Sequence, residues 1–404
     1  MNTWRSEIEL EQACALIAGT QALTGRATLP LRETGGLLLA EDIYAPIDQP
    51  PFDRSPLDGY ALRAEDTTGA GQDTPVFLRV VDKLYAGDVP GRAVESGQAV
   101  RIMTGAMLPP RADCVIRQED TDLGEQTVAI YRQLKHHQNF CFRGEDFRAG
   151  SLLLPTGTKL TAATLGVLAS AGVTHITARP KAKVALLTTG DELFDAQPGV
   201  SLPPGKIYSS NLDMLYARLT ELGYRPVYTA QTGDDPNAAA DAIRAGLESA
   251  DLMITTGGVS VGEKDIFHEV MPLLGAERIF HRVKIKPGTP AMFSRVGGKP
   301  VLSLSGNPFA AAATFELLAR PLLAAISGDH SLLPLKAQAV MAMPYNKETP
   351  TRRFVRGRLE NGGVTLQGGH SSGQLRSLVG CNCLVEILPG TSALKGDCVA
   401  VYII

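Results

Sequence analysis

The chain has 404 residues, of which 44% are hydrophobic and 20% charged, and its 39 basic residues nearly balance 42 acidic ones for a net charge of −3. A chain of this length exceeds a single hydrophobic core, so we expect two to four domains. The balanced charge gives no overall field for nucleic acid or an anionic membrane, so any anion site has to be local.

The N-terminal segment is polar and acidic, unlike a signal peptide. The most apolar stretch, residues 307–327, is interrupted by Glu316 and Arg320, which argues against a membrane span. The six cysteines and seven histidines show no zinc-site spacing. We therefore expect a cytoplasmic protein that engages neither nucleic acid nor membrane.

The first half of the chain predicts two helices around a β region. Apolar residues at helical spacing predict an amphipathic helix over residues 6–24. A second apolar stretch, 161–172, is expected to pack back on it. The dipeptide Asp58-Gly59 is a turn signal before an alternating strand. Four further strands are predicted between glycine- and proline-containing turns, at residues 76–81, 98–103, 113–118 and 127–132.

From Lys183 to about residue 326, strand and helix patterns alternate, which predicts a doubly wound, mostly parallel sheet with helices on both faces. The last 75 or so residues return to short runs separated by turn signals, and they predict a small β domain. The fold class is therefore multidomain, with α/β and β parts.

Four loops that follow strands of the α/β region carry polar residues. They are residues 189–192, 233–235, 257–265 and 305–308. Ligands of open parallel sheets bind outside the carboxyl ends of the strands, so these loops should converge there. Three of them bring carboxylates, which suit a hard cation such as Mg²⁺ beside a phosphate. Each carboxylate alone is explained equally well as a helix cap, and it is the convergence that favours a site.

The loop after the strand at 252–254 has a composition suited to anions. Gly257 and Gly258 allow backbone N–H groups to point at a phosphate. Other small or polar residues of these loops are candidate contributors: Gly190, Ser260, Ser305 and Asn307. The chain lacks both the P-loop and the strand-linked GxGxxG pattern, which excludes the corresponding nucleotide-binding classes.

A basic strand adjoins these loops. At a strand period of two, Arg282, Lys284 and Lys286 share one face, while Val283 and Ile285 point the other way. Solvated lysines on an edge strand are the alternative interpretation. Cations for phosphate beside carboxylates for a metal are the division that a nucleotide or pyrophosphate site requires.

These motifs together resemble the molybdopterin molybdenumtransferase family, which includes bacterial MoeA and the E domain of gephyrin. The resemblance is collinear over essentially the whole chain. It is carried by PPFDRSPLDGYALR (50–63), RIMTGAMLPPRADCVIRQED (101–120), RGEDFRAG (143–150), TTGDEL (188–193), TTGGVSVGEKD (255–265), KPGTPAMF (286–293) and LSGNPFA (304–310).

The resemblance implies four domains. They are a discontinuous helical domain (1–45 with 147–178), an inserted β domain (46–146), an α/β molybdopterin-binding domain (179–328) and a C-terminal β-barrel (329–404). It also implies an elongated homodimer, with a cleft between the third domain of one subunit and the second domain of the other. Contacts with the molybdopterin adenylyltransferase are expected as well.

The implied reaction takes adenylylated molybdopterin and molybdate, requires Mg²⁺ or Zn²⁺, and yields molybdenum cofactor and AMP. Carried over by motif, Asp58, Thr104 and Asp146 are expected catalytic residues that line the second-domain side. Glu192, Asp234 and Asp265 form the catalytic, metal-binding acidic side. The expected phosphate and oxyanion contacts are Lys286, Arg282, Ser372 and one of Arg352 and Arg353.

Three alternatives remain open at this point. The adenylyltransferase that makes the intermediate shares the α/β domain, but the additional β regions argue against it. A non-catalytic dimeric scaffold of the same family lacks support from any fused partner domain. The third alternative is an inactive or tungsten-handling paralogue. Every expected acidic position is occupied, which disfavours an inactive protein but does not distinguish molybdate from tungstate.

Overall fold

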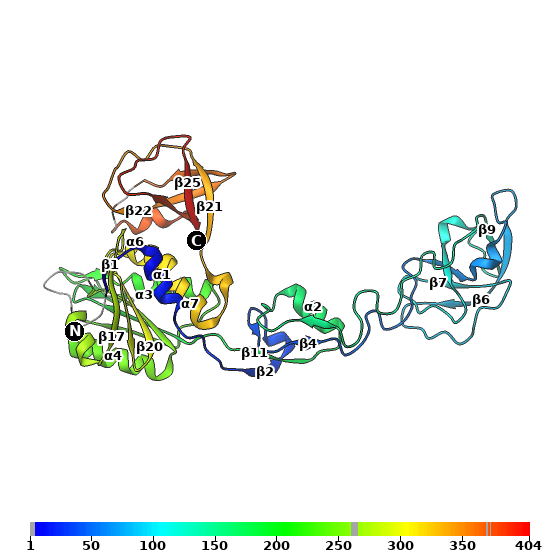
Figure 1. The fold of residues 1–404 in the computed structure, drawn as a ribbon, viewed down its shortest axis with the longest axis horizontal. Coiled ribbons are helices and arrows are strands. Elements are labelled where there is room, and N and C mark those ends of the chain that lie inside the picture. Colours follow the sequence, from blue (N-terminus) through cyan, green and yellow to red (C-terminus); the bar gives the residue numbers. More distant parts are fainter. Residues whose placement is uncertain (1–4, 260–265, 369–370, 372) are drawn as a thin grey trace. The chain divides into compact units, whose positions relative to one another are not determined.

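We describe a computed structural model of the chain, which places residues 5–259, 266–368, 371 and 373–404. The chain forms two compact units (Figure 1). The larger comprises Met1–Gly25 and Arg179–Ile404, and the smaller comprises Arg26–Ala178. Each unit is described by itself. The predicted division into four domains stays a prediction.

A seven-stranded sheet forms the centre of the larger unit, in the order β1-β17-β19-β20-β16-β12-β15. Every strand except β19 runs in the same direction, which confirms the predicted mostly parallel sheet. The strands are β1 (Arg5–Ile8), β12 (Val184–Thr189), β15 (Tyr228–Thr232), β16 (Leu252–Thr256), β17 (Glu277–Val283), β19 (Met292–Val296) and β20 (Lys299–Leu304).

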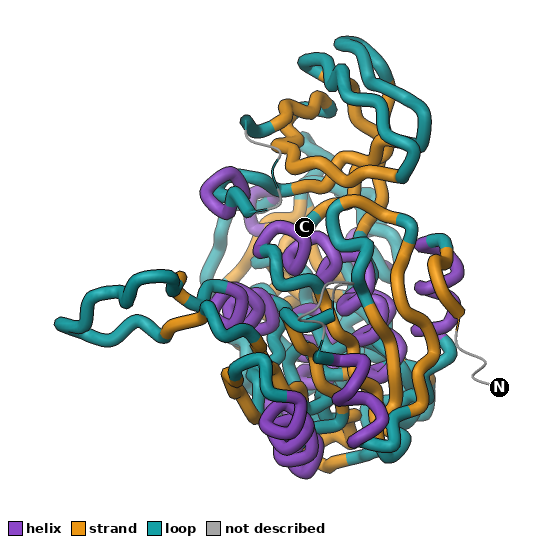
Figure 2. Tube along the Cα trace, turned by 90° about the vertical axis from the view of Figure 1, so that its left-hand side faces the viewer, coloured by secondary structure: helices purple, strands orange, loops and turns teal. Residues whose placement is uncertain are grey.

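Helices cover both faces of this sheet, as the orange strands between purple helices show in Figure 2. One face carries α1 (Leu10–Ala18), α3 (Asn211–Glu221), α6 (Pro308–Thr314), the π-helical turn η4 (Phe315–Ala319) and α7 (Arg320–Ser327). The other carries α4 (Pro236–Ser249) and α5 (Phe267–Leu273). Because both faces are covered, the central strands β12 and β16 are buried at every residue.

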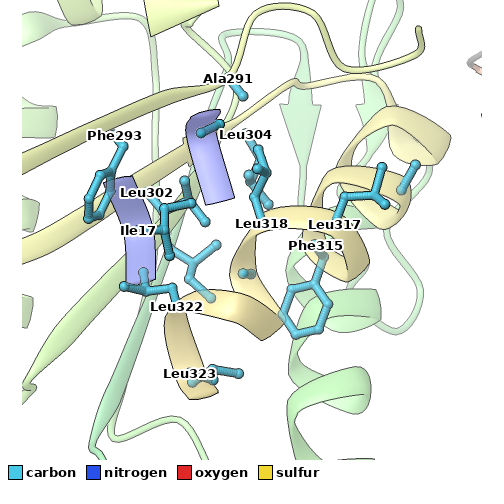
Figure 3. Packing of buried hydrophobic residues seen from close by; sticks show 14 of the residues in the cluster. Ile17, Ala291, Phe293, Leu302, Leu304, Phe315, Leu317, Leu318, Leu322 and Leu323 are labelled. Carbon is cyan, nitrogen blue, oxygen red and sulfur yellow. The ribbon is translucent and has the colours of Figure 1, made fainter. Parts of the chain in front are cut away.

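The larger core lies between the sheet and the α6–α7 segment. Figure 3 shows Leu302 of β20 and Leu322 of α7 in this cluster, together with Ile17 of α1. The segment Pro308–Ser327 has the length and hydropathy of a membrane span, but 89% of its apolar stretch is buried within the fold. It is therefore the central core helix of this unit.

The N-terminus differs from its prediction. Residues Arg5–Ile8 form an edge strand, and the helix covers only Leu10–Ala18. Helix α1 packs on α7 and β17 in the larger unit, whereas α2 (Ala162–Ser170) packs on β10 (Leu152–Leu154) in the smaller unit. The expected pairing of these two helices was wrong, because the apolar stripe of α1 joins the larger core instead.

The C-terminal residues form a closed five-stranded barrel, which confirms the predicted small β domain. Its cyclic strand order is β22-β23-β21-β25-β24, with β24 also pairing with β22. The strands are β21 (Leu335–Met341), β22 (Arg352–Glu360), β23 (Gly363–Leu366), β24 (Cys383–Ile387) and β25 (Cys398–Ile403). A short strand of the preceding region, β18 (Ile285–Lys286), pairs in parallel with β22, so Lys286 lies beside Arg353.

In the smaller unit, the five predicted β segments each become a strand of one sheet, in the order β8-β5-β7-β6-β9. They are β5 (Gly59–Leu62), β6 (Val76–Leu84), β7 (Gln98–Ile102), β8 (Cys114–Arg117) and β9 (Thr127–Ile130). Strand β5 is buried throughout rather than alternating, because Tyr60 and Ala61 enter separate cores on its two faces.

The rest of the smaller unit contains α2 and short strands. These are β2 (Ala27–Pro30), β3 (Leu38–Leu39), β4 (Ile43–Tyr44), β10 and β11 (His175–Arg179). Strand β11 lies between β2 and β3, and β4 pairs with β10.

A buried ion cluster lies within the core helix. The Glu316 carboxylate is 2.7 Å from Arg218 Nε and 3.0 Å from Arg320 Nη1. The Glu316 side chain is only 6% exposed. Its charge is therefore compensated inside the fold, which is how the two charged residues fit a largely apolar helix.

We predict that Glu316→Ala lowers the free energy of unfolding of the larger unit by about 3–5 kcal/mol, because two arginines lose their buried partner. Glu221 offers a matched control, since it also pairs with Arg218 but its side chain is 63% exposed. Glu221→Ala should cost less than about 1 kcal/mol. Urea unfolding followed by circular dichroism measures both, and equal losses would contradict the prediction.

Candidate active site

A pocket of about 950 Å³ lies at the carboxyl ends of β12, β15, β16 and β20. In the sheet, β12 pairs with β15 on one side and with β16 on the other. The direction in which strands are added therefore reverses at β12, and the pocket lies at this reversal. All four predicted loops reach it. The predicted site residues that line it are Gly190, Glu192, Asp234, Gly257, Gly258, Lys286, Ser305, Asn307 and Arg353.

The pocket contains a turn that only glycine can form. Gly257 has φ = +91°, and a Cβ at this position would lie 2.1 Å from the backbone oxygen of Thr189. Gly258 follows with φ = +61°. The Thr189 hydroxyl beside them is buried without a hydrogen-bond partner among the described residues. A turn of this shape with unused polar capacity suits an anion or another polar ligand.

The acidic side of the pocket is built from two loops that hold each other. The backbone N–H of Asp234 donates to the Asp191 carboxylate at 2.9 Å, and Lys206 donates to the backbone oxygen of Asp191. Glu192 and Asp234 both line the pocket. Asp265, the third predicted ligand, and Ser260 lie outside the described residues.

Within the residues that the structure describes, no three His, Cys, Asp or Glu side chains gather as a metal site. The two carboxylates of Glu192 and Asp234 nevertheless fit Mg²⁺, which typically takes one or two carboxylates together with substrate phosphates and water. A Zn²⁺ site takes at least three protein ligands, and the third predicted carboxylate, Asp265, lies outside the described residues.

The basic side arises from the pairing of β18 with β22. Lys286 and Arg353 are cross-strand neighbours, and both line the pocket. Arg353 is only 7% exposed, and its Nη1 donates to the Tyr345 hydroxyl at 2.8 Å. Its Nε is buried without a partner in the described part of the chain. This unused donor leaves Arg353 equipped to bind an oxyanion.

The structure separates Arg353 from two other predicted basic contacts. Arg352 pairs with Glu386 and, at 2.5 Å, with Glu11 of α1. Arg282 lies 3.1 Å from the Glu7 carboxylate. Neither lines the pocket. Of the pair that the sequence left undecided, Arg353 is therefore the one placed to contact a ligand there.

Arg356 is a contributor that the sequence analysis missed. It is fully buried, and its guanidinium carbon lies 3.8 Å from the ring centre of Phe309, which lines the pocket. It donates to the backbone oxygens of Ser371 and Gln374 at 2.6 and 2.5 Å. Burial holds the pKa of Arg356 below its usual value. Ser372, the predicted contact, lies outside the described residues.

The signal for Arg356 was its position in a strand with apolar neighbours. An arginine in a buried strand needs several acceptors, and here they come from the loop that brings Ser371 and Gly373 to the pocket. Arg356 thus positions that loop. The sequence does not show which acceptors meet such an arginine, so the role of Arg356 required the structure.

In the smaller unit, Asp58 and Thr104 are brought together. The Thr104 backbone N–H and hydroxyl donate to one oxygen of Asp58, at 2.7 and 2.6 Å. The hydrogen bond from the hydroxyl, and to a smaller extent the one from the N–H, lowers the pKa of Asp58 below its ordinary value. Asp146 is exposed, and its backbone N–H donates to the oxygen of Gln49 at 2.9 Å.

Comparison with known proteins gives matches over nearly the whole chain. Residues 8–172 match the MoeA N-terminal region (domains I and II). Residues 185–325 match a probable molybdopterin-binding domain, and residues 338–404 match the MoeA C-terminal region (domain IV).

Named relatives are similar over nearly their full length. A molybdopterin molybdenumtransferase of Staphylococcus epidermidis is 32% identical over 395 residues, covering 97% of this chain and 94% of the relative. One of Staphylococcus aureus is 34% identical over 393 residues, covering 96% and 93%. A crystal structure of a molybdopterin biosynthesis MoeA protein from Pyrococcus horikoshii matches with a TM-score of 0.84, 28% identity and coverage of 98% and 100%.

The strand-end pocket, the barrel joined through β18 and the full-length matches agree with one another. The chain belongs to the MoeA family of molybdopterin molybdenumtransferases.

Proposed function

We propose that this protein is a transferase of molybdenum cofactor biosynthesis that inserts molybdate into adenylylated molybdopterin and releases AMP. The observation that carries the proposal is the lining of a single pocket by carboxylates (Glu192, Asp234) and cations (Lys286, Arg353). A substrate with phosphates, a metal requirement and a second oxyanion needs both kinds of charge.

The chain's own residues account for binding and charge stabilisation. Lys286 and Arg353 bind the phosphates and molybdate, and Lys286 stabilises the negative charge that develops as AMP leaves. The backbone of Gly257 and Gly258 receives an oxyanion. Held by Glu192 and Asp234, with Asp265 as the predicted third ligand, Mg²⁺ would neutralise the phosphate charge. This chemistry requires no nucleophilic side chain.

The alternatives are less well supported. Relatives matched over more than nine-tenths of their length carry the molybdenumtransferase name, which does not favour the adenylyltransferase. The scaffold alternative gives no reason for charged residues inside a pocket. The sequence and the pocket leave molybdate and tungstate equally acceptable, since both are tetrahedral dianions.

The wild-type protein, given adenylylated molybdopterin, Mg²⁺ and molybdate, should release AMP in a molybdate-dependent manner. Lys286→Ala should lower the turnover about a hundredfold or more, since removing one preorganised charge contact costs that much. Lys284→Ala is the matched control, because Lys284 lies two residues earlier and pairs with Glu9 at 2.9 Å. Chromatography of released AMP measures all three.

Lys284→Ala should turn over like the wild-type protein. Absence of molybdate-dependent AMP release from the wild type would refute the proposed function. Equal activity of the two lysine variants would refute the role of Lys286 while leaving the reaction intact.

For the metal, Glu192→Gln and Asp234→Asn should each raise the Mg²⁺ concentration needed for half-maximal activity by about tenfold or more. Asp235→Asn provides the control, because Asp235 caps α4 through the N–H of Asn237 at 3.0 Å, and asparagine keeps a cap. Calorimetric titration with Mg²⁺ gives a second readout. Unchanged Mg²⁺ dependence in both variants would contradict the assignment.

We also propose, from the family resemblance, that the protein acts as a cytoplasmic homodimer that contacts the molybdopterin adenylyltransferase. Asp58, Thr104 and Asp146 would then serve the site from a second subunit. Light scattering should give about twice the chain mass of 43.0 kDa. A single-chain mass at assay concentration would contradict the dimer.

A further inference from the structure

One wall of the pocket differs in character from the charged ones. Strands β13 (Leu193–Phe194) and β14 (Ile207–Tyr208) form a short parallel pair. The Ile207 N–H donates to the oxygen of Glu192 at 2.8 Å, and the Ser209 N–H donates to Phe194 at 3.0 Å. Leu193, Ile207 and Tyr208 line the pocket, and we call these three residues the β14 wall.

The β14 wall presents apolar surface that the described residues of its unit leave exposed. Ile207 is 54% exposed and Tyr208 is 46% exposed. The Tyr208 ring lies 6.4 Å from that of Phe194, which supports its position. An exposed aromatic at the edge of a pocket is the usual platform for a flat ring, because stacking removes apolar surface from water.

Asn211, which also lines the pocket, has a hydrogen-bond acceptor without a donor among the described residues. Asn211 begins α3, and its Nδ2 donates to the oxygen of Gly306 at 2.8 Å, which fixes the orientation of the amide. Its Oδ1 is buried, and no donor within the described part of the chain reaches it. Asn211 and Ser209, whose hydroxyl is likewise buried without a partner, both line the pocket.

A buried acceptor is costly unless a ligand supplies a donor. Ionised phosphate and molybdate bring acceptor oxygens, so they do not satisfy Asn211 Oδ1. The amino group of a heterocycle would supply such a donor. The charged side of the pocket, with Lys286 and Arg353, is therefore distinct in chemistry from the side with Tyr208 and Asn211.

We propose that Tyr208 and Asn211 form a ring subsite, in which a flat heterocycle stacks on Tyr208 and donates from its amino group to Asn211 Oδ1. The proposal rests on the proposed function, because adenylylated molybdopterin contains two amino-substituted rings, adenine and pterin. Both share the required chemistry, and binding experiments distinguish them.

The binding test uses two pairs of probes. AMP carries an amino group on its purine where IMP carries an oxygen. Pterin and lumazine differ in the same way on the pteridine ring. In one of the two pairs, the compound with the amino group should bind more tightly than the compound with the oxygen. That pair shows whether the subsite takes the purine or the pteridine. Tyr208→Ala should weaken the binding of the amino compound about tenfold, the usual effect of losing one stacked ring, and Tyr208→Phe should restore it. Asn211→Leu should abolish the preference for the amino member.

Tyr44→Ala is the matched control, since Tyr44 is 57% exposed on β4 of the smaller unit, outside the pocket. In the AMP-release assay, Tyr208→Ala should raise the KM for adenylylated molybdopterin about tenfold and leave the KM for molybdate unchanged. A variant that merely folds less well would instead lose turnover without this selective rise in one KM.

The outcomes separate this proposal from the proposed function. No turnover by the wild-type protein would refute the function. If the wild type turns over but Tyr208→Ala behaves like Tyr44→Ala in probe binding and in KM, the ring subsite alone is refuted. Equal binding of amino and oxo probes by the wild type would overturn the assignment of Asn211.

Discussion

The pocket depends on the two-residue pairing of β18 with β22, which joins the α/β region to the barrel. In this parallel pair Lys286 lies beside Arg353, and Ile285 lies beside Arg352. Because side chains alternate along a strand, Arg353 enters the pocket while its neighbour Arg352 turns to Glu11 and Glu386. A shift of one residue would exchange the two arginines.

The same pairing explains how a nearly neutral protein gains a local anion site. Several cations near the pocket are neutralised by carboxylates: Arg282 by Glu7, Lys284 by Glu9, and Arg352 by Glu11 and Glu386. Lys286 and Arg353 line the pocket instead, as Glu192 and Asp234 do. Buried Arg356 supports the pocket wall, because it donates to the backbone oxygen of Ser371 and stacks on the ring of Phe309.

Features that depend on residues close together in the sequence could be predicted from it. The strand-end loops converged as the topology rule for parallel sheets requires, and the turn at Gly257 was recognisable from its composition. Long-range choices were not visible in sequence. The apolar stripe of α1 does not itself specify which core it joins. The register of β22 decides between Arg352 and Arg353, and the burial of Arg356 depends on a loop fifteen or more residues away.

The most direct test of this account is the position of the oxyanion itself. Crystals soaked in tungstate, a heavy analogue of molybdate, would reveal its position by anomalous scattering. The account predicts a peak within hydrogen-bond distance of both Lys286 Nζ and the Arg353 guanidinium, in the pocket at the carboxyl ends of the strands. A peak at Arg352 or Arg282, with none beside Lys286 and Arg353, would contradict it.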